Sequence, residues 1–101
     1  MSGINQVVLS GRLTRDPEYF AGSGDKKSRA RYTLAVDRAK EGADFIPCLV
    51  FGHNAEFAKA HLKQGTKVTI VGKLQTGSYQ NPEGQKVYTM DVVVETHDLG
   101  A

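Results

Sequence analysis

Residues 65–95 read GTKVTIVGKLQTGSYQNPEGQKVYTMDVVVE, the longest run of this sequence whose residues agree on one structure. Between Val68 and Thr76, apolar or small residues alternate with mostly polar ones, and a period of two predicts a β-strand. The β-branched and aromatic residues from Val87 to Glu95 predict a second strand, and the sequence NPEG at 81–84 supplies turn residues between them. This stretch therefore predicts a long antiparallel hairpin.

The outer part of the hairpin is polar, basic and aromatic, with little that could form a core. Its residues are Gln75, Thr76, Ser78, Tyr79, Gln80, Gln85, Lys86 and Tyr88. We expect this arm to project from the body of the protein and to contact a partner.

The rest of the chain predicts three more strands, at residues 4–14, 29–38 and 44–52, from the same alternation of apolar side chains. The segment from Glu18 to Ser28 is predicted to be a loop, in which Tyr19 and Phe20 plug the bottom of the core. In the strand at 44–52 both faces are apolar. The face that carries Phe45 and Phe51 is therefore either covered by a second layer or free to bind something apolar, such as nucleic-acid bases.

A short helix is predicted from Ala55 to Lys63. Asn54 is a suitable N-cap, and Gly65 is suited to stop the helix. The order is thus three strands, one helix and two strands, in an all-β fold with one short helix. That order is typical of the five-stranded oligonucleotide-binding (OB) barrel, here with the long hairpin arm between its last two strands.

Length and composition limit the class of protein. With 101 residues, the chain is expected to form one domain spanning residues 1–101. No apolar run long enough for a membrane span and no signal peptide are seen, and the single cysteine, Cys48, fits a reducing compartment, so we expect a cytoplasmic protein with no membrane partner. The net charge is only +2, but basic residues outnumber acidic ones in residues 1–40, which favours a polyanion partner.

Several motifs resemble those of the bacterial single-stranded DNA-binding proteins. They are NQVVLSGRLTRDPE at 5–18, YTLAVDR at 32–38, DFIPCLVFG at 44–52, GKLQTGSY at 72–79, YT at 88–89 and VVV at 92–94. Together they cover nearly the whole chain in the right order. The resemblance implies an OB fold that binds single-stranded DNA without sequence preference in replication, recombination and repair, as a homotetramer or a dimer, in association with the nucleoid.

The resemblance also assigns residues to DNA binding. Phe45, Phe51 and Tyr79 match positions of stacking aromatics, and Lys40 stands where many members carry another aromatic, so a phosphate contact is expected there instead. Members usually continue into a flexible segment with an acidic tip that recruits replication and repair proteins. This sequence stops at Ala101, so we expect that such a tail was either removed or never present.

The residue types add further candidates for DNA contact. Arg29, Arg31 and Lys73 are expected to bind phosphates, and Lys86 and Tyr88 on the arm complete the predicted set. For each aromatic the alternative is ordinary packing. Phe20, Tyr32 and Phe57 are assigned to packing, and Cys48 to a buried structural position.

Two other functions are alternatives for a chain of this kind. A replication-restart accessory protein without a tail, whose main role is to bridge other proteins on DNA, would be a dimer with weak binding to short sites. An OB-fold nuclease would need clustered carboxylates and a metal, and no such cluster is recognisable among Asp16, Asp37, Asp44 and Asp91. The three histidines lack ligand spacing. We therefore predict no metal, no cofactor and no enzymatic activity.

Overall fold

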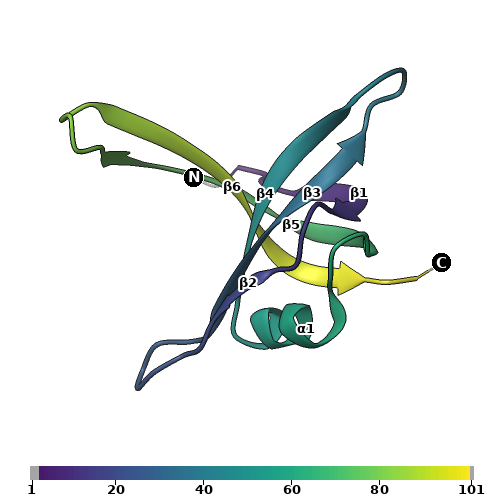
Figure 1. The fold of residues 1–101 in the computed structure, drawn as a ribbon, viewed down its shortest axis with the longest axis horizontal. Helices are drawn as coiled ribbons and strands as arrows, with labels where there is room; N and C mark the ends of the chain where they lie inside the picture. The colour runs from purple at the N-terminus through teal and green to yellow at the C-terminus, as the bar shows by residue number, and fades with distance from the viewer. Residues whose placement is uncertain (1–2, 101) are drawn as a thin grey trace.

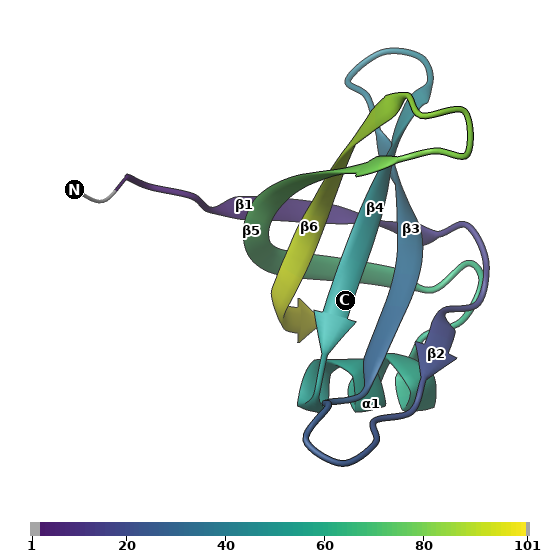
Figure 2. The ribbon, with the colours of Figure 1, turned by 90° about the vertical axis from the view of Figure 1, so that its left-hand side faces the viewer.

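The structure is a computed structural model that describes residues 3–100, and its elements are arranged as Figures 1 and 2 show. The elements follow in the order β1 (Val7–Leu13), β2 (Glu18–Phe20), β3 (Arg29–Asp37), β4 (Ala43–Phe51), α1 (His53–His61), β5 (Lys67–Gln80) and β6 (Lys86–Asp98). The predicted all-β fold with one short helix is confirmed. A three-residue strand, β2, lies where a loop was expected.

The strands form one sheet in the order β1-β5-β6-β4-β3-β2, and β1 also pairs with β3. This last pairing, Arg12 with Ala35 and Leu13 with Leu34, closes the five long strands into a barrel. β4 and β6 run parallel, and every other pairing is antiparallel. A closed barrel that carries its helix between the third and fourth long strands is consistent with the OB fold.

The core lies inside this barrel and under the helix. Its buried side chains are Leu13, Ala30, Tyr32, Leu34, Cys48, Val50, Ala55, Ala58, Leu62, Val68, Ile70, Val92 and Val94. Helix α1 covers one end of the barrel (Figure 2). The alternation predicted for the strands at 29–38 and 44–52 places Ala30, Tyr32 and Leu34 of β3 and Cys48 and Val50 of β4 in the core, while Val36 and Ile46 on the same faces are partly buried against it.

The helix begins two residues earlier than predicted and ends two residues earlier. Its N-cap is Gly52, with φ 58°, and the side chain of Asn54 does not cap it. The Asn54 amide instead donates to the carbonyl oxygens of Val94 (3.3 Å) and Glu95 (3.2 Å), which fastens the helix to β6. The Asn54 side chain thus bonds to β6, which is distant in sequence, instead of forming the N-cap hydrogen bond that the sequence predicts.

The predicted hairpin is present and is longer than expected, since β5 and β6 pair from Thr69–Asp98 out to Gln80–Lys86. It extends well away from the barrel (Figure 1). The register shifts between Val71 and Gly72, where a side chain on Gly72 would approach the Val93 carbonyl oxygen within 2.2 Å. Beyond this bulge Leu74, which continues the apolar alternation that begins at Val68, is 41% exposed, because the arm leaves the barrel here.

His97 is neutral and largely enclosed, and its Nε2 lies 2.8 Å from the Tyr32 hydroxyl. Its ring stacks on Phe57 of the helix at 4.9 Å. Burial lowers the pKa of His97 to about 4. Because an unfolded histidine titrates near pH 6.5, the unfolded chain binds a proton that the folded chain excludes between pH 6.5 and 4.

We therefore expect the free energy of unfolding to fall as the pH drops from 6.5 to 4. The contribution of His97 should be about 1–2 kcal/mol, after allowance for the partial exposure of its ring. His97→Gln should flatten this part of the curve, and His53→Gln, at an exposed position, should not. Urea unfolding at a series of pH values measures both. Equal pH dependence in wild type and His97→Gln would contradict the assignment.

Candidate nucleic-acid interface

The outer face of β3 and β4 brings together rings and cations. In the antiparallel register, Arg29 lies opposite Phe51 and Arg31 lies opposite Leu49. Directly opposed side chains share a face, and the residues between these positions are buried in the core. Arg29, Arg31 and Phe51 must therefore point outward. The alternation in the sequence places Phe45 and Phe51 on this face. Within residues 3–100 no second layer of the protein covers it.

The arm completes a groove on the same face. The groove encloses about 600 Å³ and is lined by Phe20, Arg29, Arg31, Leu49, Phe51, Tyr79, Thr89 and Asp91. Phe51 is 43% exposed and Tyr79 is 57% exposed. Tyr79 reaches the groove from β5 although it lies far from Phe51 in sequence. The two predicted stacking rings are thus lining residues of one hollow.

Phe45 lies on the same outer face, nearer the turn between β3 and β4. It pairs in register with Ala35 and is 66% exposed. Beside it the Arg38 guanidinium donates to one Asp44 oxygen from Nε (3.1 Å) and Nη2 (2.8 Å). This contact lowers the pKa of the Asp44 carboxyl and links the two ends of the turn that carries Lys40. Lys40 is exposed at the turn and lies outside the groove.

Lys73 belongs to the outer face by register. It lies opposite Val93, which itself lies beside Leu49 of β4. Its ammonium is 3.5 Å from a Glu95 oxygen, and both side chains are about half exposed or more. An exposed ion pair of this kind contributes little to stability, so a phosphate could displace Glu95 at small cost.

Lys86 and Tyr88 lie on the opposite side of the arm from Tyr79. Tyr88 pairs with Ser78 and Lys86 pairs with Gln80, whereas Tyr79 pairs with Val87. The Lys86 ammonium sits over the Tyr88 ring at 5.3 Å, and Tyr88 is 75% exposed. The predicted set of residues is therefore divided between two surfaces.

Phe20 was assigned to packing, and that prediction is wrong. It is 41% exposed and lines the groove, while its neighbour Tyr19 turns inward and donates a hydrogen bond to Glu56 of the helix. Because neighbouring side chains of a strand point to opposite faces of the sheet, Tyr19 and Phe20 of β2 lie on different faces. A three-residue alternation is too brief to recognise in a sequence, although the polar Glu18 before Tyr19 is compatible with it.

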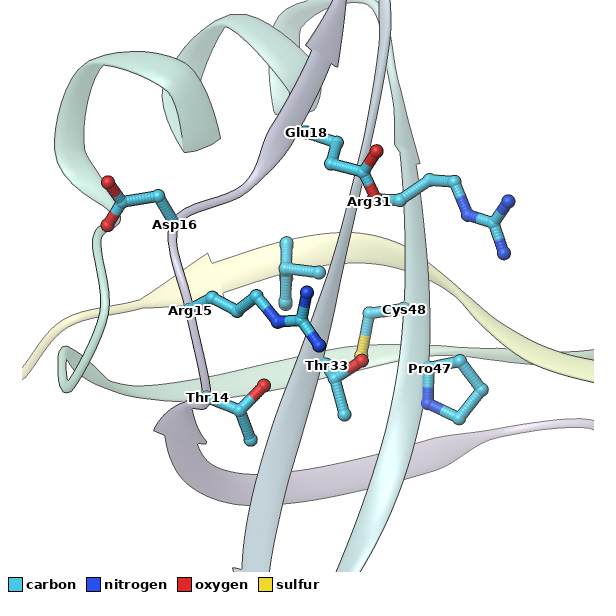
Figure 3. A pocket seen from close by; sticks show the side chains of 9 residues that line it. Thr14, Arg15, Asp16, Glu18, Arg31, Thr33, Pro47 and Cys48 are labelled. Carbon is cyan, nitrogen blue, oxygen red and sulfur yellow. The ribbon is translucent and has the colours of Figure 1, made fainter.

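A second hollow, of about 310 Å³, lies where β1 gives way to β2 (Figure 3). Arg15 is directed across it toward Thr33 and Cys48, while the Arg31 side chain extends away from Arg15. Asp16 and Glu18 also line it, so its charges are mixed, and it offers no exposed ring. It is less suited to nucleic acid than the groove.

The thiol of Cys48 forms part of the floor of that hollow and is buried, as predicted. Burial, with a smaller effect from Asp91, raises its pKa to about 12. A thiol held in its protonated form is a poor nucleophile.

Residues 3–100 contain no group of three or more His, Cys, Asp or Glu side chains placed to hold a metal ion. They also contain no helix with the length and apolar character needed to cross a bilayer.

Comparison with known proteins identifies the family of the chain. The family model described as "Single-strand binding protein family" matches residues 4–99. The chain belongs to this family. The resemblance seen in the sequence motifs is thereby confirmed.

Known relatives are similar to this chain over nearly its whole length. The "Single-stranded DNA-binding protein" of Clostridium perfringens is 44% identical over 98 residues, covering 95% of this chain and 65% of the relative. Its namesake in Fusobacterium nucleatum is 41% identical, covering 96% and 67%, and that of Enterococcus faecalis is 41% identical, covering 95% and 54%. The chain thus spans between about half and two thirds of the length of these relatives.

Proposed function

We propose that this chain, as one domain over residues 1–101, binds single-stranded DNA without sequence preference and protects it during replication, recombination and repair. The observation that carries the proposal is the groove on the outer face, in which the exposed rings of Phe51 and Tyr79 lie together with Arg29 and Arg31, while Phe45 is exposed further along the same face. Rings accept any base by stacking, and cations neutralise the backbone. The proposed action is binding alone, without metal, cofactor or catalysis, in the cytoplasm and on the nucleoid.

The proposed contacts divide by chemistry. Phe45, Phe51 and Tyr79 stack bases, while Arg29, Arg31, Lys73 and Lys40 contact phosphates. Lys86 and Tyr88 form a separate contact for a strand that passes round the arm. The relatives are named for single-stranded DNA binding, which favours this function over a replication-restart accessory role. Recruitment of replication and repair proteins by an acidic C-terminal tail stays a prediction.

We further propose that the protein assembles as a homotetramer. The edge of β1 from Val7 to Ser10 that faces away from β5 has no strand partner in the described chain, and Val8 is 60% exposed. On the side of the arm that carries Tyr88 and Lys86 at its tip, Leu74 and Met90 lie nearer the barrel and are also exposed, at 41% and 58%, so this inner part is available to a second copy. Two distinct surfaces that each pair with a copy of themselves generate a tetramer, whereas one generates a dimer.

One titration tests these proposals. Purified protein is titrated with fluorescent oligo-dT and with a duplex of equal length, while light scattering gives the mass of the free and bound species. We expect tight binding to the single strand, weak binding to the duplex, and the mass of four chains. Equal affinity for both DNAs would reject the function, and the mass of two chains would reject the tetramer.

A further inference from the structure

Phe20, Arg29 and Phe51 form a row across three neighbouring strands. Phe20 is paired with Arg29, and Arg29 with Phe51, so that Arg29 occupies the middle position of the row. The Arg29 carbon Cζ is 4.9 Å from the centre of the Phe20 ring. This cation–π contact holds the Phe20 ring in place on the edge strand. A ring fixed in advance loses little conformational freedom when a base stacks on it.

The row also separates two hollows. Phe20 and Arg29 line the groove on one side, and on the other they line a hollow of about 230 Å³ with Ala21, Ser23, Lys26 and Lys27. The loop that carries these lysines is ordered by hydrogen bonds in both directions between the backbones of Ser23 and Lys26 (3.1 and 2.9 Å). Neither lysine takes part in an ion pair within residues 3–100. Their charges are therefore available to a phosphate.

We propose that the bound strand continues out of the groove across Phe20, which stacks one base, and onto the loop between β2 and β3, where Lys26 and Lys27 contact the next phosphates. This inference rests on the proposed function and extends its site by a segment that Phe51 and Tyr79 do not reach. Phe20 remains 41% exposed despite this contact, so the residue has accessible surface on which a base can stack. The two lysines then continue the alternation of ring and cation.

Photocrosslinking tests this path on the unaltered protein. Oligo-dT carrying 5-iodouracil is bound, irradiated and digested with trypsin, and mass spectrometry locates the linked residue. We expect a crosslink in the peptide of residues 16–26, at Phe20, besides those in the groove. Crosslinks at Phe51 or Tyr79 with none at Phe20 would overturn the inference and leave the proposed function standing. An absence of oligo-dT binding would overturn both.

Matched variants give the size of the effect. Phe20→Ala should weaken binding to oligo-dT by about 5- to 150-fold, the range expected for one stacked base. Leu99→Ala, which removes an equally exposed side chain outside the groove, should not. The variant Lys26→Ala/Lys27→Ala should make the slope of log affinity against log salt shallower by about 1.4, since each phosphate contact contributes about 0.7. Lys63→Ala/Lys67→Ala changes the charge equally and should leave that slope nearly unchanged. Wild-type affinity in Phe20→Ala would contradict the stacking role.

Discussion

The variant Phe45→Ala/Tyr79→Ala is expected to bind oligo-dT about 2–6 kcal/mol more weakly than the wild type, because each ring is proposed to stack a base and one such contact is worth about 1–3 kcal/mol. Both side chains are more than half exposed, so their removal should leave the barrel intact. Fluorescence polarisation at fixed salt measures the loss, and circular dichroism checks the fold.

The matched control keeps a ring at each position. Phe45→Trp/Tyr79→Trp retains two aromatic faces, and we expect its affinity to stay near that of the wild type, because stacking tolerates different rings. An alanine variant with undiminished affinity and an intact fold would remove both residues from the site.

The variant Arg29→Ala/Arg31→Ala is expected to lose the phosphate contacts at the centre of the groove. If each arginine neutralises one phosphate, the slope of log affinity against log salt becomes shallower by about 1.4. The wild-type and variant slopes are measured by titration at several salt concentrations. The largest difference in affinity should appear at low salt, where counterion release contributes most.

The control is Arg29→Lys/Arg31→Lys, which keeps both charges. We expect it to retain the wild-type slope, although its affinity is reduced where the planar guanidinium itself makes a contact. A slope that stays unchanged in the alanine variant would show that these arginines do not neutralise phosphates.

The fold could be predicted from the two-residue alternation of apolar side chains and from the order of strands and helix along the chain. Long alternating segments such as the one that begins at Val68 specify strands by themselves, because one face must be buried. The strand β2 was missed because three residues are too few to establish a period. The start of the helix was misplaced because Asn54 bonds to β6, a partner that only the folded chain brings near.

The site was predictable wherever one strand decides which way a side chain points. Phe45 and Phe51 share the outward parity of β4 and are exposed as expected. For the arm, parity within a strand was insufficient, because the pairing of Tyr79 with Val87 decides which residues of β6 share its face. Lys86 and Tyr88 fall on the other face for that reason. The sequence of either strand alone does not specify how β5 pairs with β6, because that pairing is set by the turn between them.

The exposed rings are proposed to recognise the bases themselves, and this central claim can be tested with two ligands. Fluorescence polarisation compares oligo-dT with an abasic oligonucleotide of equal length, which carries the same phosphates without bases. If each stacked base contributes about 1–3 kcal/mol, the wild type should bind the abasic strand far more weakly, and the variant Phe45→Ala/Tyr79→Ala should lose much of this preference. Equal affinity of the wild type for the two strands would contradict the account.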